Sequence, residues 1–201
     1  MAVLLDAVDR AVPTTFATPA PDGDIAAASA ALTAHGFDVR VVDTGEEARG
    51  LVLGLIPDGA EVHQASSTTL DQIGITEAIA SSERFEALRP RIWSMDRATQ
   101  KREIRKLSSA PDIMLGSVHA VAATGSLLTA SFSGSQLGPY ASGAGRVILV
   151  VGAQKIVPDV AEGLRRIEEH ALPLEDARAR AAYGMGSGIN GVLILNAQID
   201  P

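Results

Sequence analysis

The stretch GRVILVVGA, residues 145–153, decides the fold class because it is the most hydrophobic run in the chain. An unbroken aliphatic series, from Val147 to Val151, stands between Arg146 and Gly152. A strand of this composition usually lies covered on both faces, as the strands of parallel sheets do. The run therefore predicts a strand inside a sheet that helices cover on both sides.

Outward from this run, helical and extended patterns alternate along the chain. Apolar spacing and the positions of Gly and Pro predict helices at residues 24–35, 44–56, 71–80, 96–109, 158–170 and 174–183. Strands are expected at residues 37–42, 60–65, 111–121, 145–153 and 191–199. Pro90 is expected to hold residues 89–95 extended, and Pro173 to separate the last two helices. This alternation predicts an α/β fold with a layered, open, mostly parallel sheet and helices on both faces.

The segment HAVAATGSLLTAS, residues 119–131, has the pattern of a β-hairpin. Apolar residues stand on both sides of Thr124 and Gly125, and a glycine supplies the positive φ that a tight hairpin turn needs. We expect this hairpin to be inserted beside the sheet. A short helical segment at residues 136–140 is expected to follow it.

Length and composition favour one cytoplasmic domain. The chain has 201 residues and a mass of 20.8 kDa, which predicts a single domain over residues 1–201 with an N-terminal helix and extension at about 1–22. The N-terminal residues lack the basic and long apolar regions of a secretory signal, and no window approaches 18 apolar residues. Without cysteine, the chain carries no iron–sulfur cluster, zinc finger or disulfide of its own. No metal site is predicted.

The charge is acidic overall but basic in one segment. A formal net charge of −7 and a pI of about 5.0 oppose binding to nucleic acid or to an anionic membrane. Within residues 89–106, two acids accompany seven basic residues: Arg89, Arg91, Arg97, Lys101, Arg102, Arg105 and Lys106. This segment is either a solvated helix face or a docking surface for an acidic partner.

Hydroxyl residues gather in the stretch HQASSTTLDQIG, residues 63–74. Ser66, Ser67, Thr68 and Thr69 precede a helix expected to begin near Leu70. One hydroxyl could cap the helix while the others face solvent. Alternatively, the hydroxyls and the free N–H groups at the helix N-terminus form an anion-binding site, because helix N-termini attract negative charge.

Two further groups of residues could face the same ligand. The first stands in the turns around the hairpin. The second consists of residues just after the apolar run and residues within the glycine-rich segment YGMGSGING, residues 183–191. Polar residues after the carboxyl ends of strands commonly line ligand sites in α/β sheets. The ligand-binding candidates outside the hydroxyl stretch are His119, Thr124, Gly134, Ser135, Gln136, Gly152, Lys155, Ser187 and Asn190.

His119 and Lys155 are the two candidates for a catalytic role. An imidazole between a buried strand and a hairpin could act as acid, base or donor, and Lys155 follows the most apolar strand. The non-catalytic alternatives are that His119 is a structural histidine and that Lys155 is a surface lysine. No P-loop, His-x-x-x-His pair or Gly-x-Ser-x-Gly elbow is present, so the common hydrolase and kinase classes are unsupported.

Several of these stretches together resemble the LUD-domain family, formerly a domain of unknown function, over about residues 25–196. The similar segments are SSTTLDQIG, GSVHAV with TGSLL, VILVVGAQKIVPDVAEGLRRI, and ARARAAYGMGSGINGVLIL. The resemblance implies a fold similar to the NagB/RpiA/CoA-transferase group. It also implies an association with lactate utilisation, as in the small third subunit of the bacterial L-lactate oxidation system, alongside partners that hold iron–sulfur clusters.

The chain departs from the family pattern at its polar positions. His119 stands where many relatives carry Asn, and Ala123 and Thr124 stand in place of an acidic pair. Residues 134–136 read Gly-Ser-Gln where relatives have Gly-Asn-Arg. The resemblance therefore implies a site at this place with altered polar groups.

Three functions are compatible with the sequence. The first is an accessory or ligand-binding subunit in lactate or organic-acid utilisation that binds a small anionic metabolite, a hydroxy-acid, an oxo-acid or a phosphate-bearing cofactor. The second is a stand-alone enzyme of the CoA-transferase or sugar-phosphate isomerase type, with His119 or Lys155 handling the proton. The third is a structural module that oligomerises, for example as a homodimer.

Overall fold

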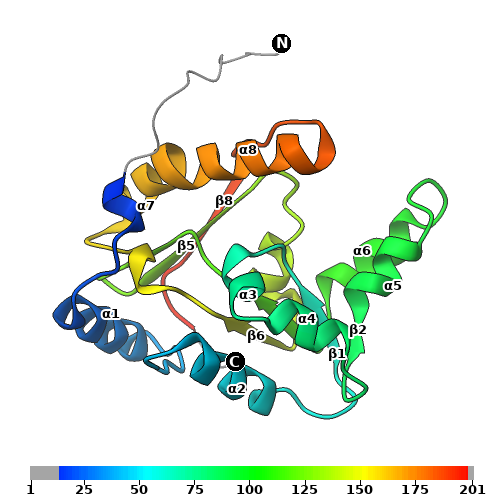
Figure 1. Ribbon diagram of the computed structural model, residues 1–201, viewed down its shortest axis with the longest axis horizontal. Coiled ribbons are helices and arrows are strands. Elements are labelled where there is room, and N and C mark those ends of the chain that lie inside the picture. The colour runs from blue at the N-terminus through cyan, green and yellow to red at the C-terminus, as the bar shows by residue number, and fades with distance from the viewer. Residues whose placement is uncertain (1–13, 199–201) are drawn as a thin grey trace.

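The computed structural model describes residues 14–198, which form two four-stranded sheets with helices packed around them (Figure 1). The strands are β1 (Glu61–Gln64), β2 (Glu86–Ala87), β3 (Ile113–Gly116), β4 (Ala120–Ala122), β5 (Ser126–Ser131), β6 (Arg146–Leu149), β7 (Ile156–Val157) and β8 (Gly191–Leu195). The α-helices are α1 (Asp22–Ala34), α2 (Gly45–Leu55), α3 (Thr68–Gln72), α4 (Ile75–Ala80), α5 (Leu88–Ser94), α6 (Lys101–Ser109), α7 (Val160–Arg166) and α8 (Leu172–Tyr183). Short 3₁₀ and π segments are η1 (Thr14–Ala17), η2 (Pro139–Gly143), η3 (Ala153–Lys155) and η4 (Ile167–Ala171).

The first sheet is entirely parallel and has the strand order β2-β1-β3-β6. In its register, Val62 of β1 pairs with Ile113 of β3, and Gly116 of β3 pairs with Leu149 of β6. Parallel neighbours need crossover connections. Helices lie between β1, β2 and β3 in the chain, whereas β4, β5 and η2 lie between β3 and β6. The predicted α/β class with a mostly parallel sheet is confirmed.

The second sheet has the order β7-β4-β5-β8 and mixes parallel and antiparallel pairs. The predicted hairpin is confirmed as β4 and β5, and its turn contains Gly125 with a φ of +91°. Within this sheet, β7 and β8 pair with the two edges of the hairpin. It forms the centre of a sheet of its own.

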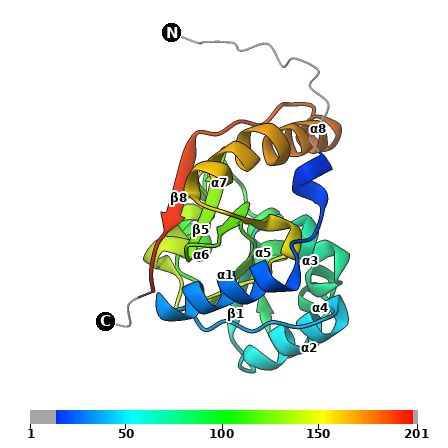
Figure 2. The same cartoon turned by 90° about the vertical axis from the view of Figure 1, so that its left-hand side faces the viewer.

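Alternating side chains of β4 build two different cores. Ala120 and Ala122 pack in a cluster with Val157 and Ile167, whereas Val121 packs with residues of α1. Figures 1 and 2 show α7 and α8 on one side of this sheet and α1 on the other. The second sheet is therefore the middle layer of an α/β/α arrangement, as the period of two along a strand requires.

A third core lies between the first sheet and the helices α2, α3 and α4. Val62 of β1 and Leu115 of β3 contribute to this cluster together with Val52 of α2, Leu70 of α3 and Ile79 of α4. Thr44 begins α2 with a capping box, in which its hydroxyl accepts from the Glu47 N–H and the Glu47 carboxylate accepts from the Thr44 N–H. Such a cap satisfies N–H groups that lack a partner inside the helix.

Two segments differ from their predicted structure because local pattern did not decide them. The strand expected at residues 37–42 is absent from the described sheets, since Phe37 and Val39 pack against a core cluster while Val41 is 59% exposed and no strand pairs with the segment. The extended structure expected at residues 89–95 is the helix α5. Pro90 is its third residue, where the missing N–H would have had no partner inside the helix.

The helix expected at residues 71–80 is two short helices. The first, α3, begins at Thr68 rather than near Leu70, and Gly74 separates it from α4 with a φ of +71°. Similarly, the helix expected from Asp96 begins at Lys101. Asp96 instead holds a turn, because its carboxylate accepts from the Ala98 N–H and the Thr99 hydroxyl.

Pro173 does not separate the last two helices. The helical path runs from α7 through η4 into α8, and η4 is a π-type turn that ends just before Leu172. A proline inside a helix removes one hydrogen bond and crowds the preceding turn. The wider π turn before Pro173 accommodates both effects.

The apolar run that predicted a doubly covered strand lies at the edge of the first sheet. Within β6, Arg146 is exposed and Val147, Ile148 and Leu149 are partly buried. The predicted strand at residues 111–121 is divided between β3 and β4, because the chain crosses from one sheet to the other at residues 117–119.

Two sequence predictions concern the chain as a whole. Most of the N-terminal helix and extension predicted at about residues 1–22 lies outside the described residues, and the single-domain organisation stays a prediction. Across residues 14–198, the structure contains no helix that is both long and apolar enough to span a membrane.

Candidate functional site

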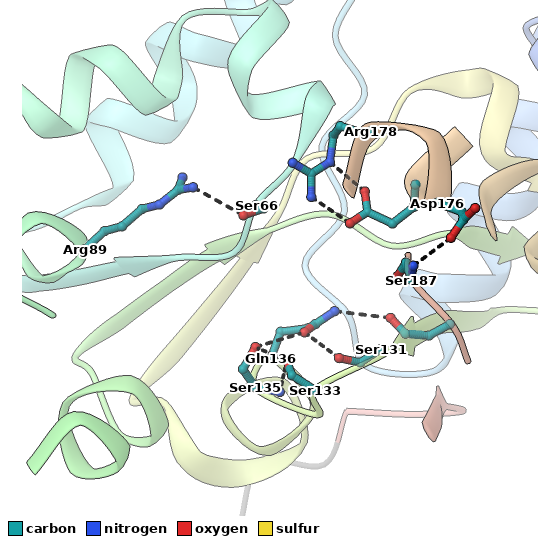
Figure 3. Close-up of polar contacts among 11 residues, drawn as sticks. Ser66, Arg89, Ser131, Ser133, Ser135, Gln136, Asp176, Arg178 and Ser187 are labelled. Carbon is teal, nitrogen blue, oxygen red and sulfur yellow. Dashed lines mark hydrogen bonds and ion pairs between the residues drawn. The ribbon is translucent and has the colours of Figure 1, made fainter. Parts of the chain in front are cut away.

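A cavity of about 320 Å³ lies where the second sheet meets the turn after β1. Its walls come from Ser66, His119 at the start of the hairpin, the turn after β5, the helix α8, and the loop of residues 185–189. Figure 3 shows Ser66, Gln136 with its neighbouring serines, and Arg178 around this space. Sites of this kind, concave and with a few convergent polar groups, are the usual places for small ligands.

Gln136 stabilises the turn after β5, which forms one wall of the cavity. Its side-chain carbonyl accepts from the Ser131 hydroxyl at 2.9 Å, and its amide donates to the Ala130 carbonyl at 3.1 Å. Ser131 in turn accepts from the N–H of Gly134, whose φ of +76° suits a glycine. Gln136 therefore fixes the turn at residues 134–136, and Ser135 lies beside it at the cavity (Figure 3).

His119 is a neutral imidazole at the cavity. Desolvation, together with the positive charges of Lys155 and Arg166, lowers the pKa of His119 to about 4. Its Nδ1 accepts from the Ala130 N–H at 3.1 Å, which assigns the remaining proton to Nε2. Within the described residues, that Nε2–H has no hydrogen-bond partner, so His119 offers the cavity a donor.

In the hydroxyl stretch, residues 66–69, three of the four hydroxyl groups accept hydrogen bonds from other groups of the protein. Ser67 caps α3 by accepting from the Leu70 N–H at 3.4 Å, and Ser66 accepts from the Arg89 guanidinium at 3.2 Å. Thr69 accepts from the Lys155 ammonium at 3.1 Å, whereas Thr68 is exposed. Because α3 has five residues, its dipole is a weaker source of positive charge than the cations that contact this turn.

Lys155 is held between two hydroxyls on different elements. Its ammonium donates to Thr69 at 3.1 Å and to Ser117, just after β3, at 2.8 Å. Burial, and to a smaller extent the charge of Arg166, lowers the pKa of Lys155 to about 8. No carboxylate pairs with Lys155 in residues 14–198, which leaves the third ammonium proton available.

Arg166 is a second cation without a carboxylate partner in the described part of the chain. It is buried, and it donates to the carbonyls of His119 and Phe16. Its Nε has no hydrogen-bond partner there, and burial lowers the pKa of Arg166 to about 10. Buried cations are usually paired, so two of them within electrostatic reach of His119 make this region an attractive place for negative charge.

The helix α8 supplies polar groups that sequence reasoning missed. Glu175 and Arg178 form an ion pair at 2.7 Å, and both line the cavity. The neighbouring Asp176 accepts from the Ser187 N–H at 2.7 Å and so attaches the loop of residues 185–189 to the helix (Figure 3). In the sequence, Glu175, Asp176 and Arg178 have the spacing of an ordinary solvent-exposed helix face. No local pattern indicates that this face lies beside the hairpin.

Five of the thirteen predicted ligand-binding residues line the cavity. They are Ser66, His119, Ser135, Gln136 and Ser187. The turn containing Gly152 and Lys155 is joined to the hydroxyl stretch through Thr69. All three predicted turns therefore belong to one region.

The other eight ligand-binding candidates do not line this cavity: Ser67, Thr68, Thr69, Thr124, Gly134, Gly152, Lys155 and Asn190. Thr124 is exposed in the hairpin turn, at the opposite end of β4 from His119. Asn190 donates to the Phe132 carbonyl at 2.9 Å and so fastens the last loop to the strand β5. Across residues 14–198, no group of three or more His, Asp or Glu side chains is arranged to hold a metal ion.

The family model described as the LUD domain matches residues 25–185 of the chain. Because this match covers most of the sequence, the chain belongs to the LUD-domain family, as its motifs predicted. Membership relates the protein to lactate utilisation. No curated protein and no solved structure matches the chain.

Proposed function

We propose that this LUD-domain chain is a cytoplasmic accessory subunit of organic-acid utilisation that binds a small carboxylate, a hydroxy- or oxo-acid of the lactate and pyruvate class. The ligand lies where the hydroxyl stretch meets Lys155 and His119. Its partners in the pathway hold the iron–sulfur clusters, since a chain without cysteine lacks the thiolate ligands that such clusters use. The chain itself is able to pair as a homodimer.

The observation that carries the proposal is the environment of Lys155. An ammonium group that is partly buried and bonded only to two neutral hydroxyls has a positive charge without local compensation. A carboxylate that accepts from the remaining ammonium proton supplies this compensation. Charge-assisted hydrogen bonds of this kind are shorter and stronger than bonds between neutral groups.

His119 supports an oxygen-rich ligand of small size. Its neutral Nε2–H is a donor suited to a hydroxyl or carbonyl oxygen next to a carboxylate. Because the charge of Lys155 is one cause of the low pKa of His119, the two groups lie within electrostatic reach of one another. A two-point contact, carboxylate to lysine and adjacent oxygen to histidine, is the pattern that a 2-hydroxy or 2-oxo acid presents.

Thermal unfolding in the presence of lactate, pyruvate, acetate and inorganic phosphate tests the proposal. A ligand at about 100 times its dissociation constant stabilises the folded state by about 2.7 kcal/mol. For a domain of this size, that corresponds to a rise in melting temperature of roughly 5–11 °C. Lactate or pyruvate should give this rise. Acetate, which lacks the hydroxyl or carbonyl oxygen next to the carboxylate, should give a smaller one.

The matched variants are Lys155→Met and Lys101→Met. Both remove one lysine charge, but Lys101 is exposed on α6. The first variant should lose the shift with lactate and pyruvate, and the second should keep it. Equal shifts in both variants, or no shift with any of the four anions in the wild type, would show that the proposal is wrong.

The lowered pKa of Lys155 favours a second candidate, an enzyme of the CoA-transferase or sugar-phosphate isomerase type. An amine with a pKa of about 8 exchanges protons near neutral pH, as a general base or acid must. This candidate predicts turnover of an acyl-CoA or sugar phosphate by the isolated chain, lost in Lys155→Met or His119→Ala. Binding of such compounds without turnover would leave the ligand-binding function.

A further inference from the structure

A second cavity, of about 350 Å³, lies between the strand β1 and the helices α4 and α5. We propose that it binds a purine-type nucleobase, a flat heteroaromatic ring with an exocyclic amino group. Its walls are separate from those of the carboxylate site, so this assignment does not rest on the proposed function. Gln64 stands at the carboxyl end of β1, the end of a parallel strand where ligands of α/β proteins usually bind.

The walls are suited to a flat apolar ring. Ile79 from α4 and Pro90 from α5 provide aliphatic surface, and Trp93 from α5 provides an aromatic ring. Trp93 is the single tryptophan of the chain and is 62% exposed, although large aromatic side chains are normally buried. Stacking on an aromatic side chain is the common way in which proteins hold a base whose partner strand is absent.

Gln64 supplies an unsatisfied polar group at this cavity. The residue is 5% exposed, and its Oε1 is buried without a hydrogen-bond partner in the described part of the protein. Buried polar side-chain atoms normally have a partner, so an orphan at a cavity calls for an explanation. A glutamine amide offers one acceptor and two donors and matches the N6 amino group and N7 of adenine.

The charges around Gln64 favour a neutral ring over a simple anion. Asp71 faces the cavity as an acceptor and bonds the Thr76 hydroxyl at 2.5 Å, while Arg89 faces it as a donor. One carboxylate and one guanidinium leave no excess charge of either sign. A wall that carries both acceptors and donors fits the mixed donor and acceptor edge of a nucleobase.

Arg89 lies between the two cavities. Its guanidinium carbon is 4.6 Å from the centre of the Trp93 ring, and its Nη2 donates to the hydroxyl of Ser66, which lines the carboxylate site. Figure 3 shows the side chain reaching toward Ser66. A phosphate attached to the bound nucleoside is therefore expected to be met by Arg89.

Fluorescence of Trp93 reports directly on this cavity, because no other tryptophan contributes. Adenosine and AMP should quench or shift the emission with saturation, and the affinity for adenosine should fall at least tenfold in Gln64→Leu. Gln72→Leu makes the same chemical change at an exposed position of α3 and should bind adenosine like the wild type. Circular dichroism of both variants checks the fold.

Two further probes separate the nucleobase from its parts. Ribose 5-phosphate lacks the base and should not change the emission, and benzoate, which lacks the amino edge, should bind more weakly than adenosine by tenfold or more. The assignment is overturned by equal adenosine affinity in the wild type and Gln64→Leu, by benzoate binding as tightly as adenosine, or by a complete lack of adenosine binding in calorimetry. Adenosine binding to Trp93→Phe is also measured by calorimetry, because this variant has no tryptophan emission.

Discussion

Lys155 gives the most quantitative prediction, because its titration couples directly to folding. Burial lowers the pKa of Lys155 from 10.5 to about 8, so in this pH range the unfolded chain binds a proton that the folded chain releases. The free energy of unfolding therefore rises with pH across this window. Linkage gives an increase of about 2 kcal/mol between about pH 7 and about pH 10, after allowance for partial exposure of the ammonium.

The comparison of Lys155→Met with the wild type isolates this contribution. Urea unfolding followed by circular dichroism, repeated at several pH values, gives the free energy of unfolding for each protein. The wild type should gain stability relative to the variant as the pH rises, and Lys101→Met should follow the wild type. Tyr140, whose pKa burial raises, is present in all three proteins and cancels in the differences. Parallel profiles for the wild type and Lys155→Met would show that the Lys155 ammonium does not titrate with a lowered pKa.

Two further predictions concern His119 and a buried glycine. Burial holds the pKa of His119 near 4, so stability should fall as the pH falls from 6.5 to about 4, and nuclear magnetic resonance should show a neutral ring protonated at Nε2 at pH 6; a midpoint near 6.5 contradicts this. Gly116→Ala should destabilise by about 2 kcal/mol, because a Cβ there overlaps the Tyr140 hydroxyl group. Its control, Gly54→Ala in the open face of α2, should stabilise by up to about 1 kcal/mol in the same urea assay.

Periodicity and turn residues predicted much of the fold. The helix α1 and its end at Gly36, the capped helix α2 and the hairpin with its turn at Gly125 follow from local patterns that the structure repeats. The motifs also identified the family correctly. These features depend on residues that are near one another in the sequence, where propensity and capping act.

Errors occurred where distant contacts decide the outcome. The alternation of Phe37 and Val39 predicted a strand, but no strand among residues 14–198 pairs with it. Pro90 was expected to prevent a helix, yet it falls in the first turn of α5, where a proline costs little. The division of the strands into two sheets also depends on pairing, which no local pattern reveals.

In the candidate site, too, some residues could be predicted from the sequence and others depend on tertiary contacts. The hydroxyl stretch and Lys155 were selected from the sequence, and the structure joins them through Thr69. The burial of Arg166 was not anticipated, because an arginine on a charged helix is usually exposed. The place of Arg178 beside the cavity depends on how α8 packs on one face of the second sheet, which is a tertiary property.

The most direct test of the carboxylate site is the nuclear magnetic resonance titration of the Lys155 ammonium with and without saturating pyruvate. A carboxylate bound to this ammonium stabilises its charged form, so the pKa of Lys155 should rise from about 8 toward the ordinary value of 10.5. The resonance of exposed Lys101 should not respond. An unchanged Lys155 pKa in the presence of bound pyruvate or lactate would show that the carboxylate does not bind at Lys155.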